Sequence, residues 1–170
     1  HFLRYYLEQS SDRDAAENAR RFDAVLGRLR SRLEAADAAA ARQLVPELER
    51  LRPFLGALVD LHWAGSLYEQ LGPQLRFENT LTAFRAWIRA ESLCRPAVLF
   101  VEDAHRLDPD SQALIHSLVQ GPEGYPFAVV LAGRCRDDGQ PFDLDLGDVP
   151  CQALALAPLP AAEIPAVAAH

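Results

Sequence analysis

Lysine is absent from this chain of 170 residues, so all 17 basic residues are arginines. A Walker-type phosphate loop needs a glycine-rich turn followed by a lysine that reaches the β- and γ-phosphates of a nucleotide. This chain therefore cannot supply such a loop. Methionine is absent as well, even at position 1, which indicates a fragment or a processed product of a longer protein.

Cysteine is scarce, and the three cysteines show no Cys-x-x-Cys spacing. This pattern is typical of a reducing compartment, so we expect a cytoplasmic protein. No apolar run approaches the ~20 residues of a membrane helix, and the first residues lack the features of a signal peptide. The formal net charge is −7 without any basic run, so we expect no binding to nucleic acid or to a membrane.

Hydrophobic residues make up 49% of the chain and charged residues 24%, as in an ordinary globular protein of one domain or slightly more. Residues 1–95 are predicted to be mostly helical. Ser10, Ser11 and Asp12 predict the start of an amphipathic helix that reaches about residue 41. Pro46 and Pro53 each predict the start of a further helix.

The most informative stretch is RPAVLFVEDAHRLDPDS, residues 95–111. Residues 97–101 form a short apolar run without helical period, which predicts a fully buried strand of a parallel sheet. Glu102 and Asp103 follow at its carboxyl end, where open α/β sheets bind their ligands. Two adjacent carboxylates are costly there unless a cation or hydrogen bonds compensate their charge, and a divalent metal carried by a nucleotide would do so.

This stretch resembles the Walker B segment of P-loop ATPases. More narrowly, it is similar to the signal-transduction ATPases of the STAND/AAA-like type, found in LuxR-type regulators and cyclase-associated predicted ATPases. The matching positions are the apolar run 98–101, Glu102, Asp103, Ala104, His105, Asp108, Pro109 and Ser111. Arg106 is a departure, because the family often has Trp there. The resemblance covers roughly residues 50–165.

A second apolar run, residues 127–132, predicts another buried strand, and Arg134 follows its end. The resemblance implies a phosphate-sensing arginine here, although the family often has Thr-x-Arg and this chain lacks the hydroxyl. The alternative for Arg134 is an ordinary surface arginine. Residues 151–156 predict a last strand, and residues 158–170 match the start of the family's lid helix.

The resemblance implies an α/β fold with the parallel-sheet core of a P-loop NTPase, a three-layer α/β/α arrangement, here truncated. Residues 1–95 would be a helical insert, residues 96–157 the strand–helix–strand core with the Walker B and sensor strands, and residues 158–170 the start of the lid. The phosphate loop would then lie N-terminal to His1.

The implied site uses Asp103 as the catalytic acid that orients water, Glu102 and Asp103 as Mg²⁺ ligands largely through water, and Arg134 as the nucleotide contact. ATP and Mg²⁺ would serve the full-length parent, a signal-transduction ATPase that regulates an attached effector. The fragment alone is expected to hold neither and to be inactive. Expected partners are ATP, other domains of the polypeptide and a second copy.

Several alternatives stay open. The two acids could cap the following turn or pair with Arg106 or Arg134, and His105 is more simply a bridging residue than a general base. The DLHWA string at residues 60–64 also resembles the family's motif, but it has one acid and no Asp-Pro helix start, so helix-end packing is preferred. The chain could also be a degenerate ATPase-like interaction module without nucleotide chemistry, or a wholly helical regulator.

Overall fold

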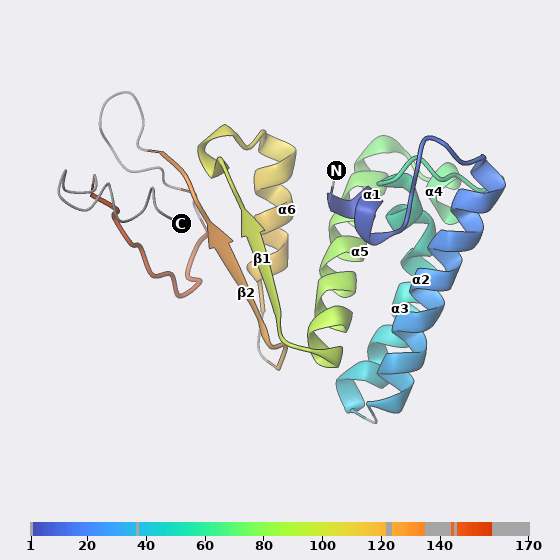
Figure 1. Cartoon of the computed structure of the whole chain (residues 1–170), viewed down its shortest axis with the longest axis horizontal. Helices are drawn as coiled ribbons and strands as arrows, with labels where there is room; N and C mark the ends of the chain where they lie inside the picture. The colour runs from blue at the N-terminus through green and yellow to red at the C-terminus, as the bar shows by residue number, and fades with distance from the viewer. Residues whose placement is uncertain (1, 37, 122–123, 135–143, 145, 158–170) are drawn as a thin grey trace, which may run out of the picture.

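The computed structural model describes residues 2–36, 38–121, 124–134, 144 and 146–157. Figure 1 shows a helical part built from α1–α5 beside a smaller part in which α6 lies against strands β1 and β2. The elements in chain order are α1 Phe2–Tyr6, α2 Ala15–Ala35, α3 Ala39–Ala57, α4 Leu67–Gln70, α5 Pro73–Cys94, β1 Ala97–Val101, the 3₁₀ turn η1 Ala104–Arg106, α6 Pro109–Val119 and β2 Phe127–Leu131.

The core of the helical part lies where α2, α3 and α5 meet, and its largest buried side chains come from all three helices. They are Trp87, Phe22, Phe54, Leu29, Leu33, Leu51 and Leu55. Helix α2 starts later than the sequence predicted, because Asp14 is its N-cap and accepts a hydrogen bond from the N–H of Glu17 at 2.7 Å. The expected start at residues 10–12 was therefore a few residues too early.

Helix α3 runs without interruption through both prolines that were expected to begin separate helices. A proline inside a helix removes one backbone hydrogen bond. Pro46 is exposed and Pro53 half-buried, while the opposite side of the helix buries Leu48 and Leu51. Burial of this apolar side offsets the cost of the two prolines.

Strands β1 and β2 form a parallel pair in which Ala97 lies opposite Phe127 and Val101 opposite Leu131. The two strands predicted at these positions are confirmed, and the described fold is α/β and mostly helical. Helix α6 connects the strands and packs on one face of the sheet, where Leu99 and Val129 join the core.

The other face of the sheet is uncovered within the described residues, which corrects the expectation of a fully buried strand. Val98 is 69% exposed, Phe100 55% and Val130 44%. Burial alternates along both strands because helices cover only one side. The described residues thus form two layers at this sheet, and a three-layer core is not seen.

The predicted last strand at residues 151–156 is also wrong, because residues 151–157 have no regular structure and are all exposed. The lid helix expected at residues 158–170 lies outside the described residues. In the DLHWA string, Trp63 is half-buried against α2 and α3 as expected for helix-end packing, but His62 is exposed. Across the described residues, we find no helix with both the length and the apolar character needed to cross a membrane.

Candidate functional site

The acidic pair lies in the turn directly after β1, and both side chains are exposed. Asp103 has a left-handed backbone conformation, with φ of 50° and ψ of 36°. Aspartate tolerates this region better than most residues. The turn then closes into η1, where the N–H of Arg106 donates to the carbonyl of Asp103 at 2.8 Å. Glu102 and Asp103 are therefore displayed at the strand end.

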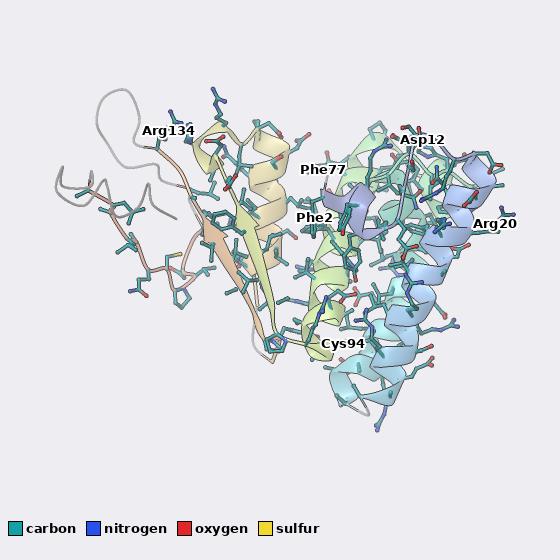
Figure 2. The ribbon with its side chains drawn as sticks, viewed as in Figure 1. Phe2, Asp12, Arg20, Phe77, Cys94 and Arg134 are labelled. Atoms are coloured by element: carbon teal, nitrogen blue, oxygen red, sulfur yellow. The ribbon has the colours of Figure 1, made fainter. Side chains whose placement is uncertain are left out.

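Backbone hydrogen bonds continue past the strands and hold their carboxyl ends together. The N–H of Ala132 donates to the carbonyl of Val101 at 2.9 Å, and the N–H of Ala104 donates to the carbonyl of Ala132 at 2.8 Å. Figure 2 labels Arg134 at the end of β2, beside the turn that follows β1. The acidic pair and Arg134 thus lie together at the carboxyl-terminal end of the sheet, because parallel strands end on the same side.

His105 links the two strand ends, because its Nδ1 accepts a hydrogen bond from the backbone N–H of Arg134 at 3.3 Å. An accepting Nδ1 places the proton of the neutral ring on Nε2. Because Nδ1 of His105 is occupied by the hydrogen bond that joins the two turns, the geometry supports a bridging role for His105.

Helix α6 begins beside the carboxyl ends of the strands, and its N-cap is Asp108. The carboxylate of Asp108 accepts hydrogen bonds from the N–H of Ser111 at 2.9 Å and from its hydroxyl at 2.8 Å. These bonds lower the pKa of Asp108 below its usual value. Asp108 is thereby committed to the helix start and does not take part in the acidic pair.

The charges at the strand ends are not neutralised by one another. Within the described residues, neither Glu102 nor Asp103 forms an ion pair, and the guanidinium of Arg134 has no hydrogen bond. The suggested pairing of the acids with Arg106 or Arg134 is therefore not seen. Two free carboxylates and a free guanidinium at one edge could contact a cation and an anion together.

A metal site made by the chain alone is not formed in the part that the structure describes. No group of three or more His, Cys, Asp and Glu side chains there could hold an ion. Glu102 and Asp103 would supply only part of the shell of Mg²⁺, which usually keeps several waters and takes further oxygens from phosphate. The residues present fit a metal that arrives with its nucleotide.

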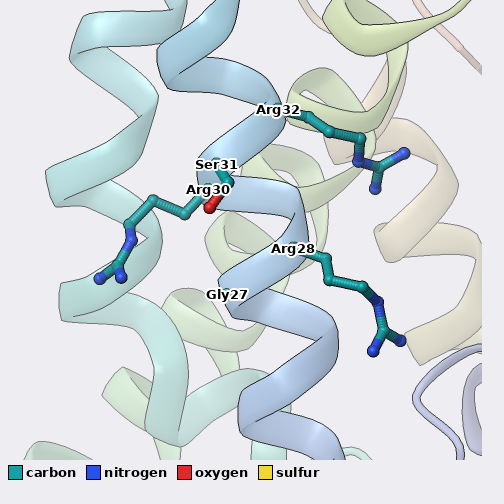
Figure 3. A pocket seen from close by; sticks show the side chains of 5 residues that line it. All are labelled: Gly27, Arg28, Arg30, Ser31 and Arg32. Carbon is teal, nitrogen blue, oxygen red and sulfur yellow. The ribbon is translucent and has the colours of Figure 1, made fainter.

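The arginine run on α2, residues 28–32, lines an open hollow of about 720 Å³ and could be taken for an anion site. Figure 3 shows Arg28 and Arg32 on one side of the helix and Arg30 on the other. Each is engaged by a carboxylate: Arg28 by Glu8, Arg30 by Glu49 at 3.0 Å and Arg32 by Glu91 at 3.0 Å. These arginines join elements of the helical part and leave no free cation for a ligand.

Sequence reasoning missed a buried polar cluster where α1, α2 and α5 meet. Glu91 is only 7% exposed, and its Oε1 accepts hydrogen bonds from the hydroxyl of Tyr6 and from Arg32. Burial and the neighbouring Glu91 carboxylate raise the pKa of Tyr6 to about 12, and burial raises the pKa of Cys94. The only signal in the sequence was a glutamate among the apolar residues of the α5 face.

Comparison with known proteins adds no assignment, since no family model, no curated protein and no solved structure matches the chain.

Proposed function

We propose that this chain is part of a signal-transduction ATPase of the STAND/AAA-like type and carries its Walker B and sensor strands. In this proposal Glu102 and Asp103 hold a Mg²⁺ ion largely through water, Asp103 orients the attacking water, and Arg134 contacts the γ-phosphate. A phosphate loop with its lysine would come from another segment of the full-length protein, and the chain alone would not hydrolyse ATP.

The observation that carries the proposal is the joint position of the acidic pair and Arg134. The three groups lie together at the carboxyl-terminal end of the sheet, because the two strands are parallel. Two hydrogen bonds hold these strand ends together, one between Ala104 and Ala132 and one between His105 and Arg134. All three remain free of ion pairs within the described residues.

The test is ATP turnover by the full-length protein with Asp103→Asn, a substitution that keeps the size of the side chain and removes its charge. We expect kcat to fall by on the order of 10²- to 10³-fold with little change in the KM for ATP, because the lost interaction acts on the attacking water. Turnover is measured as phosphate release at saturating Mg²⁺.

The matched control is Asp110→Asn, in the exposed first turn of α6 and outside the acidic pair. This variant should retain full turnover. If Asp103→Asn hydrolyses ATP as fast as the unchanged protein, the catalytic assignment is wrong.

The second candidate is a degenerate ATPase-like interaction module without nucleotide chemistry. The uncovered apolar face of the sheet favours it, since exposed patches of this kind mark interaction sites. Calorimetric titration of the full-length protein with Mg²⁺·ATP separates the two functions. Failure to bind the nucleotide would leave the interaction module as the better assignment.

A further inference from the structure

A second cavity, which the acidic pair does not line, lies between the amino-terminal half of β1 and helices α1 and α5. Its volume is about 400 Å³, within the range of ligand pockets. Its lining includes Phe2, Tyr6, Trp87, Glu91 and Arg95 and, from the sheet, Val98. Nothing in the ATPase proposal uses this cavity.

Three aromatic rings form one wall of the cavity and contact one another. The ring centroids of Tyr6 and Trp87 are 4.8 Å apart, and that of Phe2 lies 6.3 Å from Tyr6 and 6.2 Å from Trp87. Phe2 is 55% exposed whereas Trp87 is only 2% exposed, so the wall is open at Phe2. Such a wall suits a flat side chain, because aromatic pairs are favourable at these separations.

The same cavity contains a buried carboxylate with unused hydrogen-bonding capacity. Glu91 directs Oε1 to Tyr6 and Arg32, whereas its Oε2 accepts no hydrogen bond from the described residues. A carboxylate oxygen can accept two such bonds. Arg32 already balances the charge of Glu91, and the exposed Arg95 adds a positive charge at the mouth. A neutral donor therefore suits Glu91 better than a second cation.

One edge of β1 borders this cavity and is unpaired. The N–H of Ala97 donates to the carbonyl of Pro126 and the N–H of Ala132 to the carbonyl of Val101, so odd-numbered residues of β1 face β2. In a parallel ladder the N–H and C=O of Val98 must then point to the opposite side. Figure 1 shows β2 on one side of β1 and α6 beside β1 on the other, with α1 and α5 beyond α6. The lining of the cavity includes Val98, so the free edge at Val98 borders the cavity.

We propose that this edge binds an extended peptide of a partner protein that carries a tyrosine or tryptophan and, two residues later, an acidic residue. The peptide pairs with the N–H and C=O of Val98 as an antiparallel strand. Its aromatic ring packs on the rings of Phe2 and Tyr6 and donates a hydrogen bond to Oε2 of Glu91. Its carboxylate lies beside Arg95, whose guanidinium forms no ion pair within the described residues.

In this binding mode the backbone and the side chains have different roles. Backbone hydrogen bonds to a sheet edge give affinity for any extended chain, and the side-chain pocket gives the preference for one sequence. The antiparallel register places the aromatic residue beside Ala97 and the acid beside Arg95. The preference for an aromatic residue comes from the aromatic wall and Glu91, and the preference for an acid comes from Arg95. Each preference can therefore be removed by its own substitution.

The test uses the 170-residue chain and a fluorescent peptide of sequence VTYTDV, with affinity measured by polarisation. The variant Val98→Pro removes only the N–H at the free edge, where proline is compatible with a strand, and Val98→Thr is its matched control. We expect at least ~10-fold weaker binding by Val98→Pro and less than ~2-fold change for Val98→Thr. Circular dichroism confirms that both variants are folded.

Two peptide variants and one further protein variant test the pocket itself. VTFTDV lacks the hydroxyl donor and should bind ~10-fold more weakly, because a hydrogen bond to a charged acceptor is lost. Arg95→Gln should weaken binding of VTYTDV up to ~5-fold and abolish its advantage over VTYTNV, in which the acid is neutral.

Three outcomes would overturn the proposal. They are equal binding by Val98→Pro and Val98→Thr, equal affinity of VTYTDV and VTFTDV, and no binding up to about 1 mM peptide. Analytical ultracentrifugation tests whether a second copy of the chain occupies this edge instead. A dimer that dissociates in the Val98→Pro variant would show that it does. None of these results depends on nucleotide chemistry, so the proposal and the ATPase assignment can fail separately.

Discussion

At the scale of single residues, the cluster of Tyr6, Glu91 and Arg32 joins three helices through one buried carboxylate. Burying a carboxylate is costly unless partners compensate for its charge. Here the hydroxyl of Tyr6 and the guanidinium of Arg32, the latter at 3.0 Å, both bond to Oε1 of Glu91. The tyrosine can donate only while it keeps its proton, so this contact is sensitive to alkaline pH.

We expect Tyr6 to give a loss of stability between pH 10 and pH 12. Below pH 10, Tyr6 is protonated in both the folded and unfolded states, and its contribution is complete. Above pH 10 the unfolded tyrosine ionises, while the folded one keeps its proton up to its pKa of about 12. The free energy of unfolding should therefore fall over this window, by about 1–2 kcal/mol after allowing for partial exposure.

Urea denaturation at several pH values measures this loss in two variants. Tyr6→Phe should lack its share of the alkaline decrease. Tyr5→Phe should keep the full decrease, because Tyr5 is 86% exposed on the same helix. Identical pH profiles for the two variants would contradict the assignment.

The site residues show which chemistry a sequence can reveal alone. Glu102, Asp103 and Arg134 were predicted to share one sheet edge, because each directly follows an apolar run and parallel strands end on the same side. Glu91 was not predicted, since its role depends on how α1, α2 and α5 pack. Neighbours in the chain carry the first kind of information, and only the folded structure carries the second.

At the scale of elements, the packing of α2 against α3 depends on a glycine near the end of α3. A Cβ on Gly56 would clash with the ring of Trp63, and would lie 3.2 Å from the carbonyl of Leu61. Trp63 in turn lies under the guanidinium of Arg52, 3.9 Å from the ring centroid. Arg52 also pairs with Asp23 of α2, at 2.7 Å. Gly56 therefore allows the tryptophan to connect the two helices.

The substitution Gly56→Ala should lower the free energy of unfolding by about 1–3 kcal/mol, because the ring of Trp63 must move and lose its contact with Arg52. Gly27→Ala is the matched control in α2, where a Cβ meets nothing within 4 Å. It should raise stability by about 0.5–1 kcal/mol through the better helix propensity of alanine. Thermal denaturation measures both, and equal effects in the two variants would contradict this explanation.

Element boundaries were predicted least well where local signals compete with packing. Pro46 and Pro53 are strong local signals for a helix start, yet α3 continues through both because its opposite side buries Leu48 and Leu51. The stretch 151–156 is mostly apolar, but apolar character does not provide a neighbouring strand to pair with. The predictions of β1 and β2 were correct because each strand pairs with the other.

At the scale of the whole molecule, the two faces of the sheet differ in environment although their sequences do not. AVLFV and FAVVL are apolar at every position, so the sequence could not indicate which face would be covered. Leu99 packs into the core against the helices, whereas Phe100, next in the chain, is 55% exposed. A strand that is apolar on both faces is typical of a sheet with helices on both sides.

Because these two neighbours differ in burial, the same substitution should have a large effect on stability at Leu99 and a small one at Phe100. Leu99→Thr should lower the free energy of unfolding by about 1–2 kcal/mol, because it removes methyl groups of a half-buried side chain that packs against the core and places a hydroxyl there. Phe100→Thr should change it by less than about 1 kcal/mol, since the ring is already in water, and should reduce both dye binding to apolar surface and aggregation. Chemical denaturation and light scattering on the 170-residue chain measure these quantities. If Phe100→Thr destabilises the chain as much as Leu99→Thr does, then this face is covered in solution and the two-layer description of the sheet is wrong.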